Sequence, residues 1–268
     1  MLRSQALQAL LIADPDRKAL AVRALDAAAP LDAAATLAEP AGIPGRGARP
    51  PLVPHAQLAR RSMASAAGRA ALIHALAHIE ANAVNLALDI VWRFAGMPAA
   101  FYRDWIVVAQ EEALHYTLLR EHLRTLGHGY GDFPAHDALW EMAAQTRNDL
   151  LARVALVPRT LETRGLDATP PLRAKLVKAG DARAGAILDL ILRDEIGHVA
   201  LGNRWFRWLC AERGLDPIAA YAELAARHHA PRPRGPFNLE ARRAAGFTED
   251  ELEALQPDAA APGARRRL

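Results

Sequence analysis

The chain has 268 residues, with 33 Lys and Arg against 30 Asp and Glu and a formal net charge of +3. Its single cysteine, Cys210, excludes an intrachain disulfide and any zinc site built on two or more thiolates. Residues 65–213 hold 17 charges of each sign, which does not favour a nucleic-acid partner. We find neither a signal-peptide core nor an uncharged apolar stretch of about 20 residues, so we expect a cytoplasmic protein with no membrane partner.

Helical periodicity runs along the chain, and the alternation typical of strands is nearly absent. We predict a first helix over 2–27 and then a proline-rich extended arm over 29–57. Four long helical segments are expected next, over 62–95, 99–126, 137–166 and 181–213. Pro158 should kink the third of these segments or end a turn of it. The prolines of 167–171 predict a break, followed by a short helix before Asp181, the N-cap of the fourth segment.

The C-terminal part is predicted to contain a helix over 216–228, a second extended stretch and a short helix opening at Thr248. A disordered tail is expected to follow. We therefore divide the chain into an N-terminal helix and arm (1–61), a four-helix core (62–213), and C-terminal helices with the tail (214–268). The expected fold class is all-α: a four-helix bundle with an N-terminal helical extension and a C-terminal wrapping segment.

Two segments repeat one local pattern, an acid followed by Glu-x-x-His. The first contains Glu112 and His115, and the second contains Glu195 and His198. Residues three apart share a face of a helix, so each pair can bind one metal ion. Both pairs lie on apolar stripes, where an ionised carboxylate is costly unless it is paired or bound to a cation.

Two further glutamates, Glu80 and Glu162, also fall on or beside apolar stripes. Glu80 precedes Glu112 by 32 residues and Glu162 precedes Glu195 by 33. A chain that runs about 16 residues along one helix and about 16 back along the next covers roughly 24 Å in each direction. The two acids at the ends of such a hairpin therefore lie at the same height along the bundle. The order Glu, Glu-x-x-His, Glu, Glu-x-x-His on four helices is typical of ferritin-like di-iron and di-manganese proteins.

The segments HALAHIEANAVNLALD, QEEALHYTLLREHL and DEIGHVALGNRW carry a family resemblance. Residues 62–213 resemble the ferritin-like superfamily, and more narrowly a bacterial ferritin-like family without an assigned function. That family is distantly similar to the diiron tRNA hydroxylase that acts on isopentenylated adenosine. The resemblance implies a ferritin-like bundle holding two Fe ions, or an Fe/Mn or Mn/Mn pair, on Glu80, Glu112, His115, Glu162, Glu195 and His198. It implies no substrate.

Other residues near these ligands have two interpretations each. Glu111 and Asp194 either orient the two histidines, within or across helices, or are solvated charges. Glu162 either binds metal or pairs with a neighbouring arginine. Tyr116 is either a redox-active phenol beside the metals or a packing residue. Small residues such as Ala113 either allow tight helix packing or leave room for a pocket.

The favoured function is a non-haem diiron (or Fe/Mn) carboxylate oxidoreductase. It would activate dioxygen or peroxide and hydroxylate or desaturate an unidentified organic substrate. The expected partners are dioxygen, a small-molecule substrate and, for an oxygenase, an electron donor. The alternatives are a non-catalytic ferritin-like protein for iron handling and a purely structural bundle. A tRNA substrate is disfavoured by the balanced charge but stays open, and a homodimer is compatible with the sequence.

Overall fold

The computed structural model describes residues 1–59, 62–63 and 65–255, and within these ranges the chain is all-α without a strand. A lone parallel bridge between Leu52 and Ala135 is the nearest approach to a sheet there. The all-α prediction is confirmed. The predicted disordered tail lies outside the described residues, apart from its first few.

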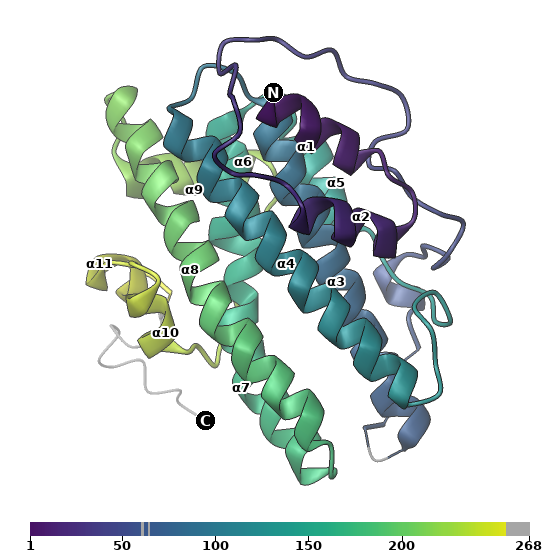
Figure 1. Cartoon of the computed structure of the whole chain (residues 1–268). Coiled ribbons are helices and arrows are strands. Elements are labelled where there is room, and N and C mark those ends of the chain that lie inside the picture. Colours follow the sequence, from purple (N-terminus) through teal and green to yellow (C-terminus); the bar gives the residue numbers. More distant parts are fainter. Residues whose placement is uncertain (60–61, 64, 256–268) are drawn as a thin grey trace, which may run out of the picture.

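Four long helices pack as a bundle: α3 (Ala66–Arg93), α4 (Ala99–Thr125), α7 (Thr163–Lys178) and α8 (Ala182–Glu212). Figure 1 shows them as two long hairpins lying side by side. The α3–α4 hairpin turns at Gly96 and the α7–α8 hairpin turns at Gly180. Both glycines have positive φ, at 81° and 86°, a conformation that glycine adopts without a steric penalty. The side chain of Asp181 caps α8 by accepting a hydrogen bond from Ala184 N, as predicted.

The third predicted helix, 137–166, is divided into shorter elements. These are α5 (Ala138–Gln145), α6 (Leu150–Leu156) and a π-helical turn, η2 (Val157–Glu162), which runs directly into α7. The chain breaks at 146–149, where the side chain of Asp149 caps α6. Pro158 stands at the start of the π turn, where its missing N–H is tolerated.

The break predicted over 167–171 is wrong, because α7 continues through Pro170 and Pro171. In a regular helix the amide of residue 170 would donate to the carbonyl of Leu166, and proline has no N–H to do so. The side chain of Asn238 donates to that carbonyl instead, at 3.2 Å. A residue 72 positions away therefore satisfies the orphaned acceptor, which local sequence rules cannot anticipate.

The single predicted helix over 2–27 is also wrong. It is two helices, α1 (Leu2–Leu10) and α2 (Pro15–Arg23), because Asp14 caps a new helix that starts at Pro15. Both lie against the α3–α4 hairpin (Figure 1). The buried guanidinium of Arg3 donates to the carbonyls of Val91 and Trp92 at the end of α3. The arm that follows is irregular except for the short 3₁₀ helix η1 (His55–Gln57).

The C-terminal segment wraps back onto the bundle with α9 (Pro217–Arg227), α10 (Leu239–Ala244) and α11 (Glu249–Glu253). The helices predicted at 216–228 and after Thr248 are present, and Thr248 forms a capping box with Glu251. Helix α10 was not predicted. Glu251 accepts hydrogen bonds from the buried Arg159 at 2.7 Å and from Arg207 at 2.9 Å, which ties α11 to η2 and α8.

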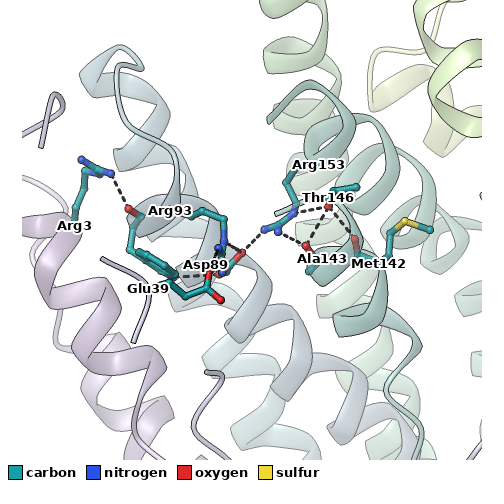
Figure 2. A network of polar contacts seen from close by, with 9 residues as sticks. Arg3, Glu39, Asp89, Arg93, Met142, Ala143, Thr146 and Arg153 are labelled. Atoms are coloured by element: carbon teal, nitrogen blue, oxygen red, sulfur yellow. Dashed lines mark hydrogen bonds and ion pairs between the residues drawn. The ribbon is translucent and has the colours of Figure 1, made fainter. Parts of the chain in front are cut away.

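A buried polar network joins the two halves of the bundle (Figure 2). Arg153 on α6 pairs with Asp89 on α3, which also accepts hydrogen bonds from Arg93. Arg153 further donates to Thr146 Oγ1 and to the carbonyl of Ala143, near the end of α5. Buried charges must be paired and hydrogen-bonded in this way to be tolerated. The network fixes α6, and with it the π turn, relative to α3.

Helix α3 is long and apolar enough to cross a membrane by length and composition alone. However, 67% of its most apolar window is buried inside the bundle. A core helix of a folded domain passes the same test, so this feature is explained by packing.

Candidate metal centre

Four acidic and histidine side chains meet in the interior of the bundle. Glu80 comes from α3, Glu112 and His115 from α4, and Glu195 from α8. Each offers one ligand atom within 4.8 Å of the ligand atoms of the other three, and all four side chains are buried. The three helices present these acids at one level, as the spacing of about 16 residues out and 16 back requires. The group could hold a metal ion.

Glu112 lies between the two histidines of the repeated pattern. Its Oε2 is 3.3 Å from Nδ1 of His115, and its Oε1 is 3.0 Å from Nδ1 of His198. Glu80 Oε2 lies 3.3 Å from the same nitrogen of His115, and Glu195 Oε2 lies 3.8 Å from that of His198. Both histidines therefore direct Nδ1 toward Glu112, and each oxygen of the Glu112 carboxylate faces a different histidine.

The outer nitrogens of the histidines are held by a crossed pair of acids. His115 on α4 donates from Nε2 to Asp194 on α8 at 3.1 Å, while His198 on α8 donates from Nε2 to Glu111 on α4 at 2.7 Å. A carboxylate on one nitrogen fixes the tautomer and leaves the lone pair of the other nitrogen available to a metal. Each acid that precedes a Glu-x-x-His thus orients the histidine of the opposite motif.

The π turn η2 delivers Glu162 to the same region. Glu162 is half-buried, and its buried Oε2 has no hydrogen-bond partner among the described residues. The neighbouring Arg159 turns away and pairs with Glu251, so it does not neutralise Glu162. Sequence rules missed the π turn, although Pro158 marks its position. Such turns occur frequently at functional sites.

Gly202 on α8 allows the π turn to approach that helix closely. A Cβ atom at this position would lie 2.8 Å from Cβ of Pro158, closer than real Cβ contacts allow. By contrast, a Cβ at Gly197 on the same helix would meet no atom within 4 Å. Close packing against Pro158 therefore requires a glycine at position 202, whereas packing does not require one at position 197.

The electrostatics of the cluster correspond to carboxylates forced together in a dry interior. Burial, reinforced by the charge of Glu112, raises the pKa of Glu80 and of Glu162 to about 8 and that of Glu195 well above its usual range. Burial opposes the ionised form of Glu112 as well, but the charge of His198 and hydrogen bonds from both histidines outweigh it and lower that pKa.

The two imidazoles respond to the same carboxylates. Burial disfavours their charged forms, yet hydrogen bonds to Glu112 and Glu80 raise the pKa of His115 to about 11. The charge of Glu112 and a hydrogen bond to Glu111 raise the pKa of His198 well above its usual range. Without a cation, protons therefore occupy lone pairs that a metal would use.

Orphaned polar atoms test whether a metal fits these residues. Buried polar atoms in folded proteins almost always have a hydrogen-bond partner. Here Glu162 Oε2 and Glu195 Oε2 have no hydrogen-bond partner among the described residues, while Glu112 Oε1 and His198 Nδ1 face each other at 3.0 Å. All four atoms are of kinds that can bind metal ions, and a set of carboxylate oxygens with imidazole nitrogens suits iron or manganese better than a soft metal. The residues present fit such ions.

The structure places only one of the two tentative pocket residues at a cavity. The hydroxyl group of Tyr116 donates to Asp16 of α2 at 2.9 Å, and its ring lines a cavity on the side of α4 that carries α2. Ala113 is fully buried and does not line that cavity. The structure thus brings Tyr116 to a cavity, but to one lined by none of the six predicted ligands.

Comparison with known proteins identifies the family. The family described as "Protein of unknown function (DUF455)" matches residues 11–253. A protein from Haemophilus influenzae, described only as uncharacterised, is 50% identical over 212 residues, which span 76% of this chain and 74% of the relative. No solved structure matches the chain significantly. The chain belongs to the DUF455 family, and the expected membership of a family without an assigned function is confirmed.

Proposed function

We propose that this DUF455 member is a ferritin-like dimetal carboxylate oxidoreductase of the cytoplasm that binds two Fe ions, or an Fe/Mn or Mn/Mn pair. The observation that carries the proposal is the buried group formed by Glu80, Glu112, His115 and Glu195. Within the described part of the chain, the Oε2 atoms of Glu162 and Glu195 also have no hydrogen-bond partner. The ferritin-like assignment rests on the packing of the long helices and on the order of the acids along them.

The geometry suggests how the ligands would be divided. Glu80 and His115 would serve one metal, and Glu162 and His198 would serve the other. Glu112 would lie between the two metals, since its two oxygens face different histidines. Glu195 could serve either metal. It lies with Glu80 in the buried cluster, and its Oε2 is 3.8 Å from Nδ1 of His198.

Bound iron or manganese would supply the redox chemistry with dioxygen or peroxide, leading to hydroxylation or desaturation of an organic substrate. The chain itself contributes three things. It excludes water, since Glu112 and His115 have no exposed surface. It orients the imidazoles through Glu111 and Asp194. It also supplies four carboxylates, whose charges balance two divalent cations. An oxygenase would further require an electron donor as partner.

Non-catalytic iron handling is a second candidate. The observation that favours it is that the cavity lined by Tyr116 is lined by none of the six ligands, so it offers a substrate no direct contact with them. Substrate-dependent oxygen consumption would distinguish the two functions.

The decisive experiment is metal analysis of protein purified without chelator and then loaded anaerobically with Fe(II) or Mn(II). We expect about two ions per chain, in line with four carboxylates and two imidazoles. Glu112→Ala should lose both ions, whereas Glu80→Ala should retain one. Glu121→Ala, an exposed glutamate on the same helix, is the matched control and should bind like the wild type. A wild-type protein that stays metal-free after loading would overturn the proposal.

A further inference from the structure

A second site lies beside α3, and none of the six predicted metal ligands lines it. It is a partly enclosed cavity of about 330 Å³ between α2, α3 and the arm segment 45–52. Asn82 and Asn85 line it, two and five residues after Glu80. At about 100° per residue, these positions point to the far side of the helix from Glu80. The cavity is distinct from the candidate metal centre, because none of the six predicted ligands lines it. Figure 1 shows α2 and the arm, which supply part of its lining, against the α3–α4 hairpin.

The described residues that line this cavity include three cationic side chains and no carboxylate. Two of the cations have partners elsewhere. Arg46 pairs with Asp137 at 2.5 Å, and Arg49, whose side chain is 76% exposed at the rim, lies 3.9 Å from Asp132. The third cation is Lys18 on α2.

Lys18 is a buried ammonium group without an acidic partner. The residue is only 5% exposed, and within the described part of the chain it forms no ion pair. Its Nζ donates to the carbonyl of Gly45 at 3.0 Å and to Oδ1 of Asn85 at 2.5 Å. An ammonium group has three donors, so one remains for a ligand.

A buried and unpaired cation is costly, and proteins usually compensate such a charge. Burial and the charge of Arg46 lower the pKa of Lys18 to about 7, which reflects the missing counter-charge. An anion inside the cavity would supply that charge, and two arginines lie close enough to line the same space.

The remaining walls are suited to an apolar group. Pro50, Pro51 and Leu52 line one side and Val84 lines another. The volume lies at the lower end of the range for small-molecule sites, which begins at about 300 Å³. The cavity thus combines a cationic end with apolar walls, as in a site for a small amphipathic molecule.

We propose that this cavity binds a small organic anion, with its carboxylate or phosphate group at Lys18 and its apolar part against Pro50 and Pro51. Arg46 and Arg49 add positive potential at the opening. The inference does not depend on the metal centre, because none of the six predicted ligands lines the cavity.

The test measures binding of four probes that share one chain length: hexanoate, hexyl phosphate, 1-hexanol and hexylamine. Titration calorimetry and ligand-detected NMR are carried out on the full chain without added metal, so that a carboxylate cannot bind to iron. We expect saturable binding of hexanoate or hexyl phosphate and none of the alcohol or the amine. The comparison of hexanoate with hexyl phosphate shows which anion class the site takes.

Lys18→Met should weaken binding of the preferred anion about tenfold or more, because a charge-assisted hydrogen bond is lost. Arg49→Glu reverses a charge at the exposed rim without disturbing the core, so it tests the site even if the first variant does not fold. It should weaken binding about threefold or more through its unfavourable potential. Arg103→Glu, an exposed arginine on α4 outside the cavity, is the matched control and should bind like the wild type. Absence of saturable anion binding, or equal binding by the wild type and the Arg49→Glu variant, would overturn the proposal.

Discussion

Loading the metal centre should release protons, and the structure sets the number. At pH 7 the metal-free site holds protons on Glu80 and Glu162, because their pKa is about 8, and burial raises the pKa of the third carboxyl group, Glu195, well above its usual range. Both histidines are protonated as well, since their pKa values are raised, to about 11 for His115. Two metals that displace all of these protons would release about five.

The charge balance of the site agrees with that number. Before loading, one ionised carboxylate and two imidazolium groups carry a net charge of +1. After loading, four carboxylates balance two divalent cations and the imidazoles are neutral. Binding of two divalent cations adds four positive charges, and the loss of five protons removes five, so the net charge of the site falls from +1 to zero. Because only a neutral imidazole and an ionised carboxylate bind the metal, the two reactions are linked.

The assay is anaerobic titration of metal-free protein with Fe(II) or Mn(II) in a pH-stat, repeated by calorimetry in buffers of different ionisation enthalpy. At pH 9 the release should be smaller by up to two protons, because that pH is above the pKa of Glu80 and Glu162. Glu112→Ala should release none, since it binds no metal. Release of fewer than two protons at pH 7 would refute the reasoning, because the carboxylates would then be ionised before metal arrives.

Three further predictions concern stability and affinity. Metal-free protein should lose stability from pH 7 to pH 9, because a folded state with raised carboxyl pKa values binds more protons than the unfolded state. Each excess proton lowers the free energy of unfolding by about 1.4 kcal/mol per pH unit. Guanidinium unfolding with and without metal checks this, and a flat metal-free profile would contradict it. Glu111→Gln and Asp194→Asn should each weaken metal affinity about 10–100-fold, measured by chelator competition, whereas Asp189→Asn, an exposed acid on α8, should not. Gly202→Ala should destabilise the fold by about 1–3 kcal/mol through overpacking, whereas Gly197→Ala should stabilise it by up to about 1 kcal/mol because a helical glycine is replaced in open space. Equal unfolding free energies for the two alanine variants would argue against the close approach of the π turn.

Several features of this protein follow from the sequence because their causes are local. Apolar periodicity places the long helices α3, α4 and α8 within a few residues of their observed ends. Asp181 caps its own helix, and Gly96 and Gly180 occupy turns with positive φ. The repeated Glu-x-x-His pattern identifies Glu112, His115 and Glu195 of the buried cluster for the same reason, since residues three apart on a helix share a face. Glu80 is found from its apolar stripe and from its spacing to Glu112.

Tertiary structure alone decided the features whose partners are distant in the chain. Helix α7 continues through two prolines because Asn238 satisfies the carbonyl that Pro170 leaves free. Glu111 and Asp194 orient histidines 87 and 79 residues away, and the sequence left open whether they acted within or across helices. The cavity at Lys18 exists only where α2, α3 and the arm meet. Helix ends and faces depend on hydrogen bonds and periodicities a few residues long, which a sequence displays directly. These pairings depend instead on which surfaces pack together, and that depends on the whole chain.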